Sequence, residues 1–255
     1  MPSSEMLEII GPALVAGIMI SLTHAPLGVE VLKRGIIFID LAVAQIAGLG
    51  LVVADMFLHE KSEWSLSLMA LLFAISAGLF FNFVEKVIPK QLEAIIGCSF
   101  VLSASLALLM LADRPHGGEE IQHLLSGQIL FVSWDIILKH VPVYFIILII
   151  WFFKQSFRRG VAFYILFAVA ITSSVQLVGV YVVFASLIMP AIATAKAKNK
   201  NLMAIICGIL SLILGIILSI LLDKPSGPMI VVTYTAIMIL TMFFINCFFN
   251  KTATI

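Results

Sequence analysis

Histidine and carboxylate side chains gather at one place in this sequence, after its fourth long apolar stretch. There His116 is followed by Glu119, Glu120 and His123. If a helix begins just before Glu119, the two glutamates precede His123 by four and three residues and share one helix face with it. Imidazole and carboxylate together suit Zn²⁺ or Mn²⁺. The four residues are therefore candidate metal ligands; the alternative is a solvated polar loop whose acids favour a helix start.

Asp40 is a second candidate, because it is a lone carboxylate inside an apolar stretch. An ionisable group within a membrane span is costly, so such a residue is a functional candidate by default. Gln45 follows five residues later, about 140° round a helix, so the two side chains flank a common side. We predict that Asp40 and Gln45 line a transport pathway. The alternative is that Asp40 lies near the cytoplasmic boundary and hydrogen-bonds to a neighbouring helix.

Two residues that disturb helices mark another candidate region of a pathway. Gly179 is followed eleven residues later by Pro190, inside an apolar stretch. Proline removes a backbone N–H and tends to kink a helix. Bent or broken helices are typical of transporters, although Gly and Pro are also common in membrane helices generally. We include both residues among the pathway candidates.

The composition shows what surrounds these residues. Of the 255 residues, 62% are hydrophobic and only 11% are charged, and the mean hydropathy is +1.18. A soluble domain carries about 25% charged residues. With so little polar surface, the solvent of this chain must be lipid.

The chain carries no sequence signature of an enzyme. The motifs G-x-S-x-G, H-E-x-x-H and G-x-x-x-x-G-K-[ST] do not occur in it. The net charge of +1 argues against a nucleic-acid partner. A transporter without a phosphate-binding loop takes its energy from an ion gradient or from a partner ATPase.

The apolar stretches predict the architecture. A bilayer core takes about 20 apolar residues as a helix, which satisfies every backbone polar group within the segment. The sequence therefore predicts an all-α, polytopic transmembrane helical bundle, a single domain over residues 1–255. The sixth and seventh stretches are short and almost continuous, so the bundle has eight or nine spans. The candidate spans are 9–25, 36–57, 64–84, 94–112, 136–153, 161–176, 178–195, 202–222 and 229–249.

Lysine and arginine residues are concentrated in alternate loops. Eleven lie in one set of loops and the tail, and the other set holds only Lys61, Arg114, Lys139 and Lys224. Basic residues favour the cytoplasmic side. This bias predicts a cytoplasmic C-terminus and, with nine spans, an N-terminus outside. The cluster from His116 to His123 then faces outward, where incoming metal arrives.

Three further polar residues are interpreted as lying in solvent or at the membrane boundary. His24 and Glu30 flank Pro26 near the first turn and are read as interfacial residues. Glu93 follows Lys90 in a stretch read as a solvated cytoplasmic loop.

Seven short segments occur in a characteristic order along the chain. They are P-L-G at 26–28, V-L-K-R-G at 31–35, L-E-A-I-I-G at 92–97, L-S-G-Q-I-L at 125–130, V-Q-L-V-G at 175–179, A-S-L-I-M-P-A-I-A at 185–193 and L-D-K-P-S-G-P at 222–228. In this order and spacing they resemble the metal-transporting ABC permeases of the zinc and manganese importer family. The resemblance spans roughly residues 25–245, and it rests on the motifs together.

The resemblance implies the permease subunit of an ATP-binding-cassette importer in the bacterial inner membrane. The expected cargo is a divalent transition metal, zinc first and then manganese or iron, and no covalently bound cofactor is expected. The implied partners are cytoplasmic ATPase subunits, an extracytoplasmic metal-binding protein, a second permease copy in a homodimer, and membrane lipid. ATP hydrolysis would take place on the separate ATPase chains.

The chain departs from the family pattern in two places. Family members commonly carry a histidine four residues after the aspartate of the second span, whereas this chain has Ala44 there. The cytoplasmic segment that docks on the ATPase is also short in this chain. Together with loop 195–201, it is predicted to contact the ATPase through Phe157, Arg158, Arg159 and Gly160.

Two other classes of function remain open from the residues alone. The chain could be a gradient-driven metal or ion carrier that works without an ATPase, or a membrane scaffold. A carrier would be expected to show several buried carboxylates for ion coupling, whereas Asp40 is nearly alone.

Overall fold

The structure is a computed structural model that describes residues 3–58, 62–112 and 129–252, with side chains described for 10–58, 62–112 and 129–245. Throughout these ranges every regular element is a helix. Eight of the described helices are long and apolar enough to cross a membrane, judged by length and composition. The prediction of an all-α transmembrane bundle with eight or nine spans is confirmed.

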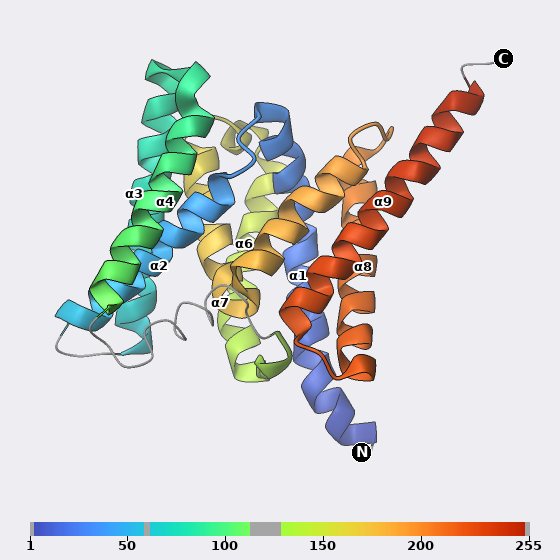
Figure 1. Cartoon of the computed structure of the whole chain (residues 1–255), viewed down its shortest axis with the longest axis horizontal. Helices are drawn as coiled ribbons and strands as arrows, with labels where there is room; N and C mark the ends of the chain where they lie inside the picture. The colour runs from blue at the N-terminus through green and yellow to red at the C-terminus, as the bar shows by residue number, and fades with distance from the viewer. Residues whose placement is uncertain (1–2, 59–61, 113–128, 253–255) are drawn as a thin grey trace. The chain divides into compact units, whose positions relative to one another are not determined.

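The helices, which Figure 1 labels along the chain, form two compact units. The first unit contains α1 (Ser3–Arg34), η2 (Ile129–Phe131), the start of α6 (Trp134–Phe153), the end of α7 (Gly160–Ala193), α8 (Lys200–Leu222) and α9 (Ser226–Thr252). The second unit contains α2 (Ile39–Phe57), α3 (Glu63–Val87), η1 (Pro89–Gln91), α4 (Leu92–Leu111), the end of α6, η3 (Gln155–Arg158) and the start of α7.

In the first unit, α1 packs against α8 through small residues. A Cβ atom on Gly17 would overlap the side chain of Leu212, and a Cβ on Gly208 would lie 3.4 Å from the Cβ of Ser21. Residue numbers therefore fall along α8 as they rise along α1, so the two helices are antiparallel. Small residues allow this close approach, which supplies van der Waals contact where lipid offers no hydrophobic driving force.

Helix α8 packs in the same way against α9. A Cβ atom on Gly215 would lie 2.7 Å from the Cα of Ile230. Thr233 Oγ1 donates a hydrogen bond to the carbonyl oxygen of Ser211 at 2.9 Å. These pairs make α8 and α9 antiparallel, so α1 and α9 run in the same direction. If both cross the membrane, the number of crossings from α1 to α9 is odd.

Helix α7 is the longest of the described helices, at 34 residues. A straight helix of that length would measure about 50 Å, well beyond a hydrocarbon core of about 30 Å. Gly179 breaks it with φ 77° and ψ 165°, a conformation open to glycine and closed to most other residues. Helix α7 therefore consists of a helical segment over 160–178 and a second over 180–193, here called the 180–193 helix.

The second unit is held together by similar close contacts. A Cβ atom on Gly50 of α2 would lie 2.8 Å from the ring of Phe73 in α3. One on Gly78 of α3 would lie 2.9 Å from the carbonyl oxygen of Tyr164 in α7. These contacts pack α2 and α7 against α3.

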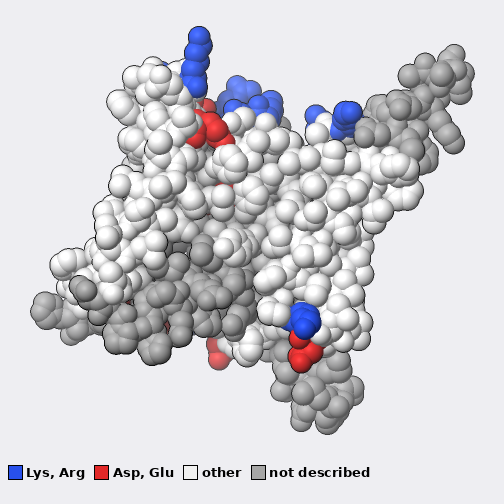
Figure 2. Space-filling view, viewed as in Figure 1, with Lys and Arg blue, Asp and Glu red and all other residues white. Residues whose placement is uncertain are grey.

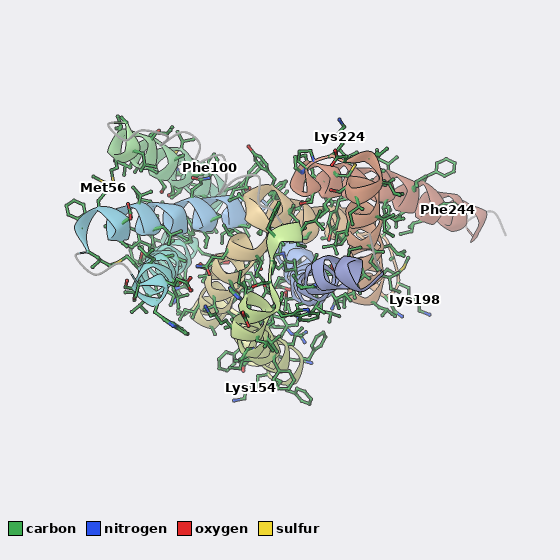
Figure 3. The ribbon with its side chains drawn as sticks, turned by 90° about the horizontal axis from the view of Figure 1, so that it is seen from below. Met56, Phe100, Lys154, Lys198, Lys224 and Phe244 are labelled. Carbon is green, nitrogen blue, oxygen red and sulfur yellow. The ribbon has the colours of Figure 1, made fainter. Side chains whose placement is uncertain are left out.

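The outer faces of the helices are apolar. Leu109 is 71% exposed and Phe244 is 60% exposed, and Figure 3 shows Phe244 pointing away from α9. In Figure 2 the visible helix flanks carry no charge, whereas Lys and Arg side chains lie at helix ends. Large apolar side chains exposed along whole helices match lipid as the surrounding solvent.

Candidate transport site

Asp40 lies in the first turn of α2. The chain reaches this helix from the end of α1 through Gly35, which has a φ of 70°. The side chain of Asp40 is 1% exposed. The backbone amides of Asp40 and Leu41 interact with the carboxylate, as expected for an acid at a helix N-terminus. Neither oxygen makes a hydrogen bond of good geometry within the described residues. The carboxylate has therefore lost its water without gaining a strong protein donor, which is costly.

Glu93 lies in the first turn of α4, near enough for its charge to act on the Asp40 carboxylate. Its Oε1 accepts a hydrogen bond from the backbone N–H of Phe38 at 3.2 Å, which satisfies a free donor at the start of α2. Its Oε2 is buried and has no hydrogen-bond partner in the described part of the chain. Glu93 thus lies in a helix and not in the expected loop, and it is half-buried. Asp40 and Glu93 form what we call the acidic pair.

The acidic pair has a simple electrostatic consequence. Two negative charges in one region, of which Asp40 is buried and Glu93 half-buried, repel each other, and a cation near both would offset that repulsion. Within the described residues, no three His, Cys, Asp or Glu side chains lie close enough to hold a metal together. A pair without a third ligand leaves several coordination positions to water, as in a weak site that releases its ion.

The other pathway candidates are placed as follows. Gln45 is half-buried on α2, in the same unit as Asp40. Gly179 and Pro190 are buried in the first unit, where Gly179 breaks α7 and Pro190 lies within the 180–193 helix. The predicted metal cluster of His116, Glu119, Glu120 and His123 lies outside the described residues.

The segment predicted to contact an ATPase is the short helix η3 and its flanks. Arg158 folds back, and its Nε and Nη2 donate to the carbonyl oxygen of Trp151 at 3.0 and 2.8 Å. Its guanidinium also lies 5.2 Å from the centre of the Trp151 ring, in cation–π contact. Phe157 is 37% exposed and Arg159 is exposed, while Gly160 turns the chain into α7 with φ 57°. Arg158 thus caps α6, and its neighbours are accessible.

The second predicted contact, loop 195–201, follows the 180–193 helix. Thr194 Oγ1 donates to the carbonyl oxygen of Pro190 at 2.8 Å and lies 3.3 Å from that of Lys200. These bonds tie the end of one helix to the start of the next. Lys196, Lys198 and Lys200 are exposed, and Figure 3 labels Lys198 among them. The loop therefore presents a compact basic surface.

His24 is also placed differently from the expectation of an interfacial residue. It is fully buried in α1, and its Nδ1 lies 2.7 Å from Ser186 Oγ in the 180–193 helix. Its companion Glu30 does lie toward the end of the helix, paired with Arg34 at 3.1 Å. His24 stands ten residues before the basic end of the span at Arg34. Ten helical residues correspond to about 15 Å along the helix axis, a distance that indicates a position well inside the span and not at the interface.

Comparison with known proteins adds to this description. The high-affinity zinc uptake system membrane protein ZnuB of Haemophilus influenzae is 27% identical over 262 residues, which cover 93% of this chain and 98% of that protein. The manganese transport system membrane protein MntC of Halalkalibacterium halodurans is 24% identical over 91% of this chain and 86% of that protein.

The fold has a solved counterpart. The structure of PsaBC from Streptococcus pneumoniae in complex with Fab matches with a TM-score of 0.73 at 18% identity, covering 93% of this chain and 92% of that chain. The profile of the ABC 3 transport family matches residues 6–162 and 158–245. Because these matches take in nearly all of the described helices, the chain belongs to the ABC 3 transport family.

Proposed function

We propose that this chain is the membrane permease of an ATP-driven importer that brings a divalent transition metal into the cytoplasm. Zinc is the first candidate, followed by manganese and iron. The observation that carries the proposal is its similarity to a zinc uptake membrane protein along 93% of this chain and 98% of that protein. A permease of this class works in the bacterial inner membrane with cytoplasmic ATPases, an extracytoplasmic metal-binding protein and a second permease copy.

The acidic pair gives the proposed pathway its chemistry. Hard and borderline divalent cations accept carboxylate oxygen, and a cation that leaves water must be met by negative charge. Asp40 and Glu93 offer that charge with only two protein groups, so binding stays weak and metal can move on. Gln45 adds a neutral donor or acceptor on the same helix. In the first unit, Gly179 and Pro190 are proposed to belong to the pathway, with Gly179 as the break that lets the 180–193 helix move separately from the rest of α7.

The loop cluster is proposed to receive the metal on the outer side. His116, Glu119, Glu120 and His123 combine ligands that match zinc and manganese. The support for this role is the spacing of these four residues in the sequence.

Reconstitution tests the proposed function. The permease is co-expressed with its ATPase, purified as a complex, and placed in vesicles with the binding protein and radioactive zinc on the outer side. We expect zinc uptake to require ATP on the side of the membrane where the ATPase subunits lie. We expect no uptake when the ATPase subunit is replaced by a variant that cannot hydrolyse ATP. Uptake by the permease alone, driven by a pH gradient, would overturn the proposal in favour of a gradient-driven carrier.

A further inference from the structure

His24 joins two helices of the first unit at the middle of the membrane. It lies near the centre of the span Ile10–Arg34 and is fully buried. An ionisable residue at this depth is expensive and points to a role that its partner reveals. The partner is Ser186, whose Oγ lies 2.7 Å from His24 Nδ1 across 162 residues of sequence.

The direction of this hydrogen bond follows from the serine. Ser186 Oγ donates to the carbonyl oxygen of Val183 at 2.9 Å, and a hydroxyl has only one proton to give. When the hydroxyl proton goes to that carbonyl, His24 Nδ1 carries the proton and donates to Ser186 Oγ. The imidazole also interacts with the Val183 carbonyl itself, which can only accept. Both contacts fix the histidine as a donor to the 180–193 helix.

A backbone contact lies one helical turn further along α1. A Cβ atom on Gly28 would overlap the carbonyl oxygen of Leu187, so only glycine permits this approach. Gly28 is four residues after His24 and therefore on the same face of α1. Leu187 directly follows Ser186. The helix is thus held to α1 by a hydrogen bond and by direct backbone contact at adjacent positions.

Ser186 is also where the 180–193 helix is weakest. Pro190 has no N–H, so the carbonyl of Ser186, four residues earlier, lacks its helical partner. The break at Gly179 frees the helix at its other end. A short helix with these two defects bends unless a neighbour supports it. His24 supports it at the residue where the bend would occur.

We propose that His24 is a positioning residue for transport. Through Ser186 it keeps the 180–193 helix straight on α1, so that displacement of the basic loop 195–201 moves the whole helix instead of bending it at Pro190. Thr194 carries the displacement from the loop into the helix through its bond to the Pro190 carbonyl. This inference rests on the proposed function, because it assigns the displacement to the ATPase.

Four variants test the contact and its role. His24→Ala and Ser186→Ala remove the bond from either side, and His24→Asn keeps an N–H donor near the Nδ1 position. Thr23→Val is the matched control, because Thr23 is also buried in α1 but bonds only to Met19 and Ile20 of its own helix. Thermal unfolding of the purified permease in detergent gives a double-mutant cycle for His24 and Ser186. The two substitutions are expected to be non-additive.

The decisive measurement is the number of zinc ions taken up per ATP hydrolysed in vesicles that hold the complex. His24→Ala and Ser186→Ala should lower this ratio at least about fivefold while ATP hydrolysis continues. His24→Asn should restore it, and Thr23→Val should match wild type. Additive unfolding effects, or a wild-type ratio in His24→Ala, would overturn the inference. So would a parallel fall of uptake and ATP hydrolysis, which indicates a structural role. Wild-type complex without ATP-driven uptake would overturn the proposed function itself.

Discussion

Asp40 is a buried carboxylate in an otherwise apolar span. Its carboxylate is buried near Glu93 without a strong hydrogen bond from the described residues. A structural ion pair would have brought a lysine or arginine to it. Among the described residues no ion pair of Asp40 is found, and we propose that the passing cation supplies its counter-charge.

Replacing Asp40 by asparagine keeps the size of the side chain and removes its charge. We expect metal uptake to fall at least about tenfold, equivalent to about 1.4 kcal/mol in the transport barrier. The amount of protein in the membrane should not change, as checked by immunoblot beside radioactive zinc uptake. Asp135→Asn, at an exposed carboxylate in the first turn of α6, is the control and should transport like wild type. Normal uptake by Asp40→Asn would remove this residue from the pathway.

Arg158 and Arg159 are neighbours with different roles. Arg158→Ala should lower the stability of the permease by about 2 kcal/mol, because two charged hydrogen bonds to the Trp151 carbonyl are lost. Arg159→Ala, at an exposed position, should change stability by less than about 0.5 kcal/mol. Thermal unfolding in detergent measures both.

Variants of Arg158 and Arg159 also distinguish an effect on permease stability from an effect on ATPase binding. Arg159→Cys, combined with a short bifunctional crosslinker, should trap the ATPase, since this side chain is free of the α6 cap. If the permease is not crosslinked in membranes that contain the assembled, active complex, the ATPase contact lies elsewhere. Loop 195–201 would then be the next candidate.

At the scale of helices, glycines decide which pairs can touch. Gly28→Ala should destabilise the first unit by about 1–3 kcal/mol, because the added methyl group meets the Leu187 carbonyl. Gly97→Ala is the matched control in α4, where a Cβ meets nothing within 4 Å. It should be neutral or stabilise its helix by up to about 1 kcal/mol. Equal melting temperatures for the two variants would mean that α1 and the 180–193 helix are not in backbone contact.

The segment from His116 to His123 is proposed to receive metal on the outer side of the membrane. Replacing His116 and His123 together by alanine removes both imidazoles. Because a receiving site is weak and partly hydrated, we expect the apparent KM for metal to rise more than the maximum rate falls. Uptake is measured across free zinc concentrations with the binding protein present. Unchanged kinetics at limiting metal would make the loop a solvated connection.

For the whole molecule, the directions of α1, α8 and α9 predict the topology. Lys198 precedes the start of α8 and Lys224 follows its end, so the two lie on opposite sides of the membrane. In a variant lacking Cys98, Cys207 and Cys247, an impermeant thiol reagent outside the cell should label Lys224→Cys and spare Lys198→Cys. Permeabilised cells provide the control, since both positions should then react. The reverse labelling pattern would invert the proposed orientation.

The sequence by itself determined the class, the spans and the family. Long apolar runs must satisfy their backbone groups internally, so hydropathy alone predicts helices. It also located the ambiguity between eight and nine spans beside Gly179, where the structure breaks α7. Asp40 could be identified as a candidate because a charged residue within an apolar segment is visible in the sequence itself.

Only the tertiary structure decided which polar groups meet. Glu93 and His24 were read as solvated or interfacial, yet one contacts the start of α2 across 55 residues and the other contacts Ser186 across 162. It also decided which of two adjacent arginines folds back onto Trp151. Such contacts depend on where small residues let helices approach and on the rotamer each side chain then adopts. Neither is encoded in the hydrophobic pattern, because that pattern records burial along one helix and not the identity of its neighbour.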